Sequence, residues 1–196
     1  MIQAADPVNT AAPSWMFDVM SANAAADIKG AIKFAADNKL KLIVAGGAEA
    51  WRCTEELKKN DVAVLMGVAQ LPTRDGDPYD AAYANAATLH KAGVRFAIVT
   101  DDASNSRNLP FEAAMAFAFG LPREAALRSI TLAPAEIFGV AAALGSIEVG
   151  KTATLIMTNG DILDHRTSIT NVIIAGRETS LDHQHQRLYD RYKARP

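Results

Sequence analysis

Asp101 and Asp102 are the acidic residues best placed to bind a ligand or transfer a proton, because they follow an apolar run from Val94 to Val99 with only Thr100 between. Near-continuous apolar runs of this kind predict buried strands of a parallel sheet. In sheets built from β/α units, functional side chains gather at the carboxyl ends of the strands. A carboxylate there can bind a metal ion or act as a general base towards a bound water molecule. The alternative is that Asp101 or Asp102 only caps the loop, since aspartate is common in turns.

Two other motifs have the spacing of known sites. The segment Gly145 to Thr152, GSIEVGKT, matches the phosphate-binding pattern G-x-x-x-x-G-K-[ST], which is meaningful only between a strand and a helix. Here a helical pattern precedes the motif and the strand-like run TATLIMT follows it, which argues against nucleotide binding. His183 and His185 have the spacing of a metal-binding pair, but they lie in a polar C-terminal stretch where solvated surface histidines are expected.

Four apolar runs, each followed by a helical pattern, must position these residues. The runs are Phe17 to Met20, Leu40 to Val44, Val62 to Met66 and Val94 to Val99. This alternation predicts four consecutive parallel β/α units with right-handed crossovers over residues 15–120. Four units are half of a (β/α)₈ barrel, whose complete form takes about 250 residues. A chain of 196 residues therefore has room for half a barrel of this kind and not for a whole one.

Beyond the fourth run the pattern changes twice. Prolines at positions 110, 122 and 134 mark the starts of short helices. From Gly145 onward, short β-rich segments separated by turn residues such as Asn159-Gly160 predict a small antiparallel sheet. We therefore expect a half barrel with C-terminal helices over 15–143, a β-rich segment over 144–180, and a polar C-terminal helix or tail over 181–196.

The order of these parts resembles the C-terminal end of the metal-dependent amidohydrolases, particularly the imidazolonepropionase-like group. The resemblance covers about residues 15 to 190 and is carried by a Thr-x-x-Pro-Ala pattern at Thr131 to Ala135, the segment Leu144 to Lys151, and the turn Ala175-Gly176-Arg177. It implies an α/β fold: the C-terminal half of a (β/α)₈ TIM-type barrel, with a small β-sheet from a composite β-sandwich domain. Similar enzymes hydrolyse C–N bonds, often in cyclic amides, with metal-activated water.

The metal ligands of that family map onto this chain only in part. The family's metal-binding aspartate after the eighth strand falls on Asp101. The histidine positions after the fifth and sixth strands fall on Ser21 and on Ala45 or Gly46, none of which is a histidine. The remaining ligands belong to a part of the family that this chain lacks. We therefore expect that the zinc or iron implied by the family is not held by this chain alone, and that Asp101 is a ligand only if the missing ligands are supplied elsewhere.

Composition excludes several classes of partner. The chain has 20 Lys and Arg against 22 Asp and Glu, a net charge of −2, and no basic block that would bind a nucleic acid. No apolar run approaches the roughly 18 residues that a membrane span needs, and the first residues lack the pattern of a signal peptide. The single cysteine, Cys53, suits a reducing compartment, so we expect a cytoplasmic location.

Two functions of different class remain open. The first is the C-terminal portion of a metal-dependent hydrolase that acts on non-peptide C–N bonds, cyclic ones among them, of a small-molecule substrate. The second is a non-catalytic structural or regulatory homologue that has lost the metal ligands. The substrate and its binding residues do not follow from the sequence.

A half barrel also leaves its first and fourth strands as open edges and its barrel-side strand faces uncovered. We therefore expect a homo-oligomer, or a missing N-terminal half, to pack there.

Overall fold

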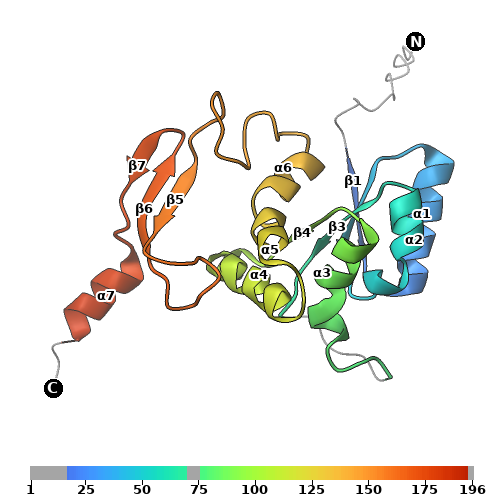
Figure 1. The fold of residues 1–196 in the computed structure, drawn as a ribbon, viewed down its shortest axis with the longest axis horizontal. Helices are drawn as coiled ribbons and strands as arrows, with labels where there is room; N and C mark the ends of the chain where they lie inside the picture. The colour runs from blue at the N-terminus through green and yellow to red at the C-terminus, as the bar shows by residue number, and fades with distance from the viewer. Residues whose placement is uncertain (1–16, 70–75, 194–196) are drawn as a thin grey trace, which may run out of the picture.

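Residues 17–69 and 76–193 are described by the computed structural model, in which two separate sheets carry the strands (Figure 1). The first sheet is parallel, with the order β1 (Asp18–Ala22), β2 (Leu42–Gly46), β3 (Ala63–Met66) and β4 (Phe96–Ile98). The second is antiparallel, with the order β5 (Leu155–Thr158), β6 (Ile169–Ile174) and β7 (Arg177–Thr179). Both sheets confirm the predicted fold class, and each parallel strand begins one or two residues later than predicted. Residues 15 and 16 of the predicted half barrel lie outside the described residues.

Helices cover one face of the parallel sheet. They are α1 (Ala25–Asn38), α2 (Thr54–Lys59), α3 (Ala81–Ala92), α4 (Leu109–Ala118) and α5 (Arg123–Ser129), and a short 3₁₀ turn, η1 (Ala50–Arg52), precedes α2. The residues Ile28, Ile32 and Ala35 recur at helical spacing and are buried, as the sequence pattern predicts. Alternate strand residues such as Val44 and Val64 meet them in one apolar core. The helical pattern of the sequence therefore produces the outer layer of a β/α architecture.

The opposite face of the parallel sheet, which would be the inside of a barrel, is partly covered by α6 (Leu132–Ile137). Ile137 packs in a second apolar cluster with Ile43, Ala63 and Ala97. This corrects the expectation of a wholly uncovered barrel side. The helix covers β2, β3 and β4 near their amino-terminal ends. It leaves β1 uncovered, as the 54% exposure of Val19 shows.

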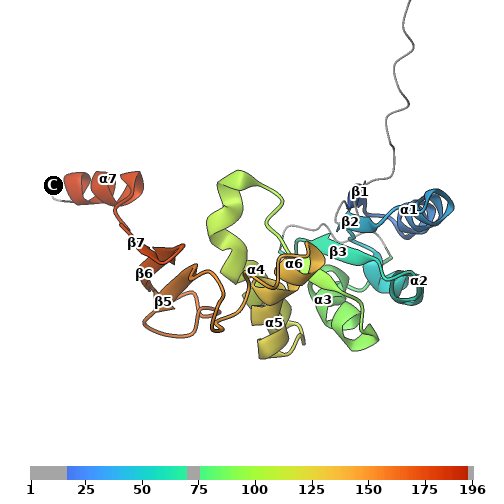
Figure 2. The ribbon, with the colours of Figure 1, turned by 90° about the horizontal axis from the view of Figure 1, so that it is seen from above.

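The small sheet stands at the far end of the molecule from β1, and α4, α5 and α6 lie between them (Figure 1 and Figure 2). Its second connection is a tight turn in which Ala175 and Gly176 both have positive φ, 49° and 78°, as a two-residue hairpin turn requires. The predicted turn at Asn159-Gly160 instead opens a longer connection over residues 159–168. The polar C-terminal stretch is a helix, α7 (Gln184–Tyr192).

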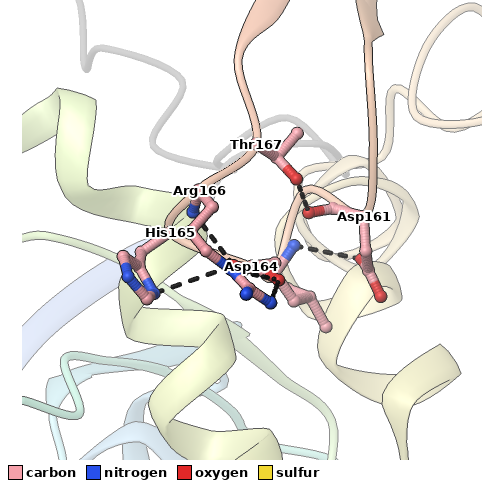
Figure 3. A network of polar contacts seen from close by, with 6 residues as sticks. Asp161, Asp164, His165, Arg166 and Thr167 are labelled. Atoms are coloured by element: carbon pink, nitrogen blue, oxygen red, sulfur yellow. Dashed lines mark hydrogen bonds and ion pairs between the residues drawn. The ribbon is translucent and has the colours of Figure 1, made fainter.

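The connection 159–168 joins the small sheet to the half barrel. Leu163 is buried and belongs to the main core. Figure 3 shows the polar contacts that shape this connection. Thr167 donates a hydrogen bond from its hydroxyl to the main-chain oxygen of Asp161, and the Arg166 guanidinium binds the Asp164 carboxylate at 2.7 Å. Asp161 also binds Arg123 of α5 at 2.8 Å, so one carboxylate links the connection to the helical layer.

No helix within residues 17–69 and 76–193 is long and apolar enough to cross a membrane.

Candidate functional site

The carboxyl ends of the four parallel strands lie along one edge of the sheet, as the register shows. Ser21 pairs with Ala45 and Ala22 with Gly46, so the two positions expected to carry histidines stand side by side on neighbouring strands. Ser21 is exposed, and Ala45 is half-buried. The structure thus places these positions together, without supplying a ligand at any of them.

Asp101 lies at the same edge, just beyond the end of β4. Its φ of 53° is left-handed, a conformation that aspartate adopts more readily than most residues. Its carboxylate turns towards the end of β3, since a Cβ built on Gly67 would lie 3.4 Å from Asp101 Oδ2. Asp102 takes the capping role, because its Oδ1 accepts a hydrogen bond from Ser104 N at 2.7 Å. Among the described residues Asp101 makes no hydrogen bond or ion pair, and its role in chemistry stays a prediction.

Gly46 occupies one of the two candidate positions for the sixth-strand histidine and has no room for a side chain. Its φ is +100°, and a Cβ there would lie 2.5 Å from Asn23 Oδ1. That oxygen accepts a hydrogen bond from Ala48 N at 3.3 Å, so a side chain at position 46 would displace Asn23 from its partner. Position 46 is therefore a close contact between the end of β2 and the loop that follows β1, and not a ligand position.

The residues present do not fit a divalent metal ion by themselves. Within residues 17–69 and 76–193, no three His, Cys, Asp or Glu side chains gather where they would hold an ion. Catalytic zinc sites usually take three protein ligands, and Asp101 alone offers one carboxylate.

Two buried polar side chains shape the strand-end loops, and sequence analysis missed both. Asn85 of α3 donates a hydrogen bond from Nδ2 to the main-chain oxygen of Gly47 at 2.9 Å. Glu112 of α4 accepts hydrogen bonds on Oε2 from Val68 N and Ala69 N, each at 2.7 Å. The sequence does hold one sign of a buried polar contact: Glu112 is a single carboxylate within the otherwise apolar helical run FEAAMAFAFG. A charged residue in such a run is buried only when it is hydrogen-bonded.

Two pockets lie at the opposite end of the parallel sheet, where β2, β3 and β4 begin. Each has a volume of ≈330 Å³, and Asp101 lines neither of them. The charged residues at their rims pair with one another: Arg95 binds Asp61 at 3.0 Å, and Arg128 binds Glu136. These four charged side chains are already paired with one another and are not free to bind a charged ligand. The carboxyl ends of the strands, where Asp101 lies, therefore stay the candidate site.

The phosphate-loop-like segment Gly145 to Thr152 and the histidine pair His183 and His185 both have structural explanations. A Cβ on Gly145 would lie 2.7 Å from Ala135 Cβ, so this glycine allows the segment to pack against α6. Lys151, which would contact phosphate in a nucleotide-binding loop, instead binds Ser146 and Glu148 within its own turn. The motif leads into strand β5 and not into a helix, so it is part of the scaffold. His183 is exposed and caps α7, because its Nδ1 accepts a hydrogen bond from Gln186 N.

Comparison with known proteins shows which family shares this architecture. The model of the amidohydrolase family matches residues 80–179, which include Asp101 and Glu112. The amidohydrolase tasK of Hapsidospora irregularis is 35% identical over 89 residues, which are 45% of this chain and 9% of that protein.

Solved structures share the fold. An amidohydrolase from Thermotoga maritima MSB8 superposes with a TM-score of 0.77 and 28% identity, over 86% of this chain and 44% of that protein. An adenosine deaminase from Xanthomonas campestris with bound zinc has a TM-score of 0.55 and 21% identity, over 87% of this chain and 48% of that protein. The chain thus spans less than half the length of these two proteins.

Proposed function

Because the chain belongs to the amidohydrolase family, we propose that it is the C-terminal portion of a hydrolase that acts on non-peptide C–N bonds of a small molecule. Members of the family are generally metal-dependent. Since the residues that the structure describes do not complete a metal site, the proposal assigns the missing ligands to the other half of the barrel. In that assembly Asp101 would be one ligand of the metal or the acceptor of a proton from water.

The observation that carries this proposal is that the adjacent carboxylates of Asp101 and Asp102 have different surroundings. Asp102 is engaged in capping the local turn, whereas Asp101 is exposed and without a hydrogen-bond partner among the described residues. Its carboxylate lies at the carboxyl end of a parallel strand, where β/α folds place their chemistry. A carboxylate held there can take the proton that water loses as its oxygen attacks a carbonyl carbon.

One observation favours a second candidate function, that of a non-catalytic structural or regulatory homologue. The contact between Gly46 and Asn23 excludes a ligand at position 46 unless Asn23 moves. The fold thus closes one of the two candidate positions for the sixth-strand histidine, which favours a homologue without the family's complete metal site.

Finer assignments belong to the same proposal. We place the chain in the imidazolonepropionase-like group, with zinc or iron as the metal and the cytoplasm as its location. The single thiol, Cys53, is buried, and burial raises its pKa, which fits a thiol that stays reduced and unreactive.

The test compares two neighbouring substitutions, Asp101→Asn and Asp102→Asn. Both remove one negative charge, asparagine tolerates the left-handed backbone at position 101, and asparagine at position 102 keeps the capping oxygen. Hydrolysis of cyclic amides such as dihydrouracil and succinimide is measured with added zinc or iron(II). It is measured for the chain alone and for the product of the complete reading frame that encodes it.

The hydrolase proposal expects Asp101→Asn to lower the rate by about 10²–10⁴-fold, the usual contribution of a general base. It expects Asp102→Asn to leave the rate within about threefold of the original, since that residue has no part in the reaction. Equal loss in both variants would contradict the role of Asp101. No turnover and no bound metal in either form of the protein would support the non-catalytic homologue.

A further inference from the structure

Glu112 is one of the few polar side chains buried in the half barrel. It lies in the first turn of α4, is 3% exposed, and directs one carboxylate oxygen, Oε2, at two consecutive main-chain N–H groups. Burying a carboxylate is costly unless strong hydrogen bonds compensate for the lost water. Both bonds here are 2.7 Å long, which is short for N–H···O contacts and typical of charge-assisted ones.

The two N–H groups belong to Val68 and Ala69, in the loop that follows β3. Gly67, the residue before them, lies beside the Asp101 carboxylate, because a Cβ built on this glycine would lie 3.4 Å from Asp101 Oδ2. The two N–H groups that Glu112 holds therefore follow directly after the residue that neighbours the Asp101 side chain. Glu112 itself follows Asp101 along the chain, so one side chain ties the two strand-end loops of the candidate site together.

The same device recurs in the first β/α unit. Glu49, which follows β2, accepts a hydrogen bond on Oε2 from Ala25 N at 2.7 Å. Ala25 is the third residue after β1, and Ala69 is the third residue after β3. In both cases a glutamate from the following unit accepts a hydrogen bond from the third residue after the strand, which is the first residue of α1 in one case and a loop residue in the other. A glutamate therefore accepts a main-chain hydrogen bond just beyond two of the four strand ends.

We propose that Glu112 is a positioning residue for Asp101: by holding the N–H groups of Val68 and Ala69, it sets the loop that supports the Asp101 carboxylate. The inference rests on the proposed function of Asp101 at this site. Glu112 touches neither water nor substrate in this role and acts only through the loop.

The test uses Glu112→Gln, with Glu124→Gln as the matched control. Glu124 also lies in the first turn of a helix, α5, but it is exposed. Two readouts are taken by NMR on isotope-labelled protein: hydrogen exchange of the Val68 and Ala69 amides, and the carbon chemical shift of the Asp101 carboxyl group. Exchange of the Val44 amide, in the core of β2, reports on global stability.

We expect Glu112→Gln to speed exchange at Val68 and Ala69 by about tenfold, because a neutral acceptor binds two amides more weakly than a carboxylate. The Asp101 carboxyl signal should shift, while Val44 exchange stays unchanged. A second variant, Glu112→Leu, removes the acceptor and should raise exchange at the two amides by about 100-fold. The control should change none of these values.

Three results would overturn the inference: unchanged exchange at Val68 and Ala69, an equal increase at Val44, or faster loop exchange with no movement of the Asp101 signal. The last would make Glu112 a purely structural residue. None of these readouts depends on hydrolysis, so the proposed function, tested separately through Asp101→Asn, and the role of Glu112 can fail independently.

Discussion

At the scale of single residues, Gly46 shows why the strand-end edge departs from the pattern expected of a metal site. A side chain at position 46 would meet Asn23, and Asn23 in turn holds Ala48 N. The glycine is needed for two reasons that add together: its positive φ and the close approach of a neighbouring loop. Only the close approach of the neighbouring loop concerns the candidate site. Its effect on stability can be measured separately from that of the positive φ.

We predict that Gly46→Ala destabilises the protein by about 1–3 kcal/mol more than Gly150→Ala does, which is the usual cost of overpacking. Gly150 has a φ of +92°, close to that of Gly46, but nothing lies within 4 Å of a Cβ built there. Backbone strain is therefore matched, and the difference isolates the contact with Asn23. Urea unfolding at neutral pH provides the measurement. Equal destabilisation in both variants would show that Asn23 moves aside freely.

At the scale of elements, the connection between β5 and β6 decides how the small sheet is attached to the half barrel. Leu163 anchors it in the apolar core, and Asp161 binds Arg123 of α5. The Arg123 guanidinium, together with the N–H of Leu163, holds the pKa of the Asp161 carboxyl below its usual range. The ionised form is thus favoured by folding, which makes this attachment sensitive to acid.

The pH dependence follows from the sign of that shift. A carboxyl whose pKa is lower in the folded state contributes stability above its unfolded pKa, and the contribution is lost as the pH falls through the folded pKa. We therefore expect Asp161→Asn to be less stable than the original protein at pH 7 and pH 5, and the gap to shrink as the pH falls below about 4. Thermal unfolding at pH 7, 5, 4 and 3 measures it. The control is Asp37→Asn, an exposed residue of α1. A gap that stays constant down to pH 3 would contradict the assignment.

At the scale of the whole molecule, the half barrel is incomplete on three sides. Within the described residues, β1 and β4 are each paired on one edge only, and α6 covers only part of the barrel side. The small sheet adds further exposed apolar residues, among them Ile156 and Met157. Open parallel edges beside apolar surface favour pairing with another β/α half, either a second copy or an N-terminal half.

We predict that the chain by itself associates at micromolar concentration, and that Val19→Lys on the open face of β1 weakens the association. A charge at an edge strand opposes pairing. Phe34→Lys on α1 is the matched control, because Phe34 is 53% exposed and Val19 is 54% exposed. Sedimentation velocity and binding of a hydrophobic dye provide the readouts. A monomer with little dye binding would show that the edges are closed within the chain.

The sequence by itself determined the elements and their type. The run Val62 to Met66 is continuous because the outer helices cover one face of β3 and α6 packs on the other face. Ile28, Ile32 and Ala35 recur with the period of a helix. These signals are local, since a strand or a helix repeats its burial pattern within a few residues. The β-rich C-terminal segment was predictable for the same reason. The role of Asp101 was inferred from the same kind of local signal, its place just beyond a buried strand, and that role stays a prediction.

Only the tertiary structure decided which side chains meet at the strand ends. Glu112 and Val68 are 44 positions apart, and Asn23 and Ala48 are 25 positions apart. No periodicity within either segment encodes such a contact. The same holds for α6, whose Ile137 packs on the barrel side against Ile43, Ala63 and Ala97, residues far from it in the sequence. Contacts of this kind depend on how the sheet twists and where each loop ends, and these follow from the packing of the whole chain.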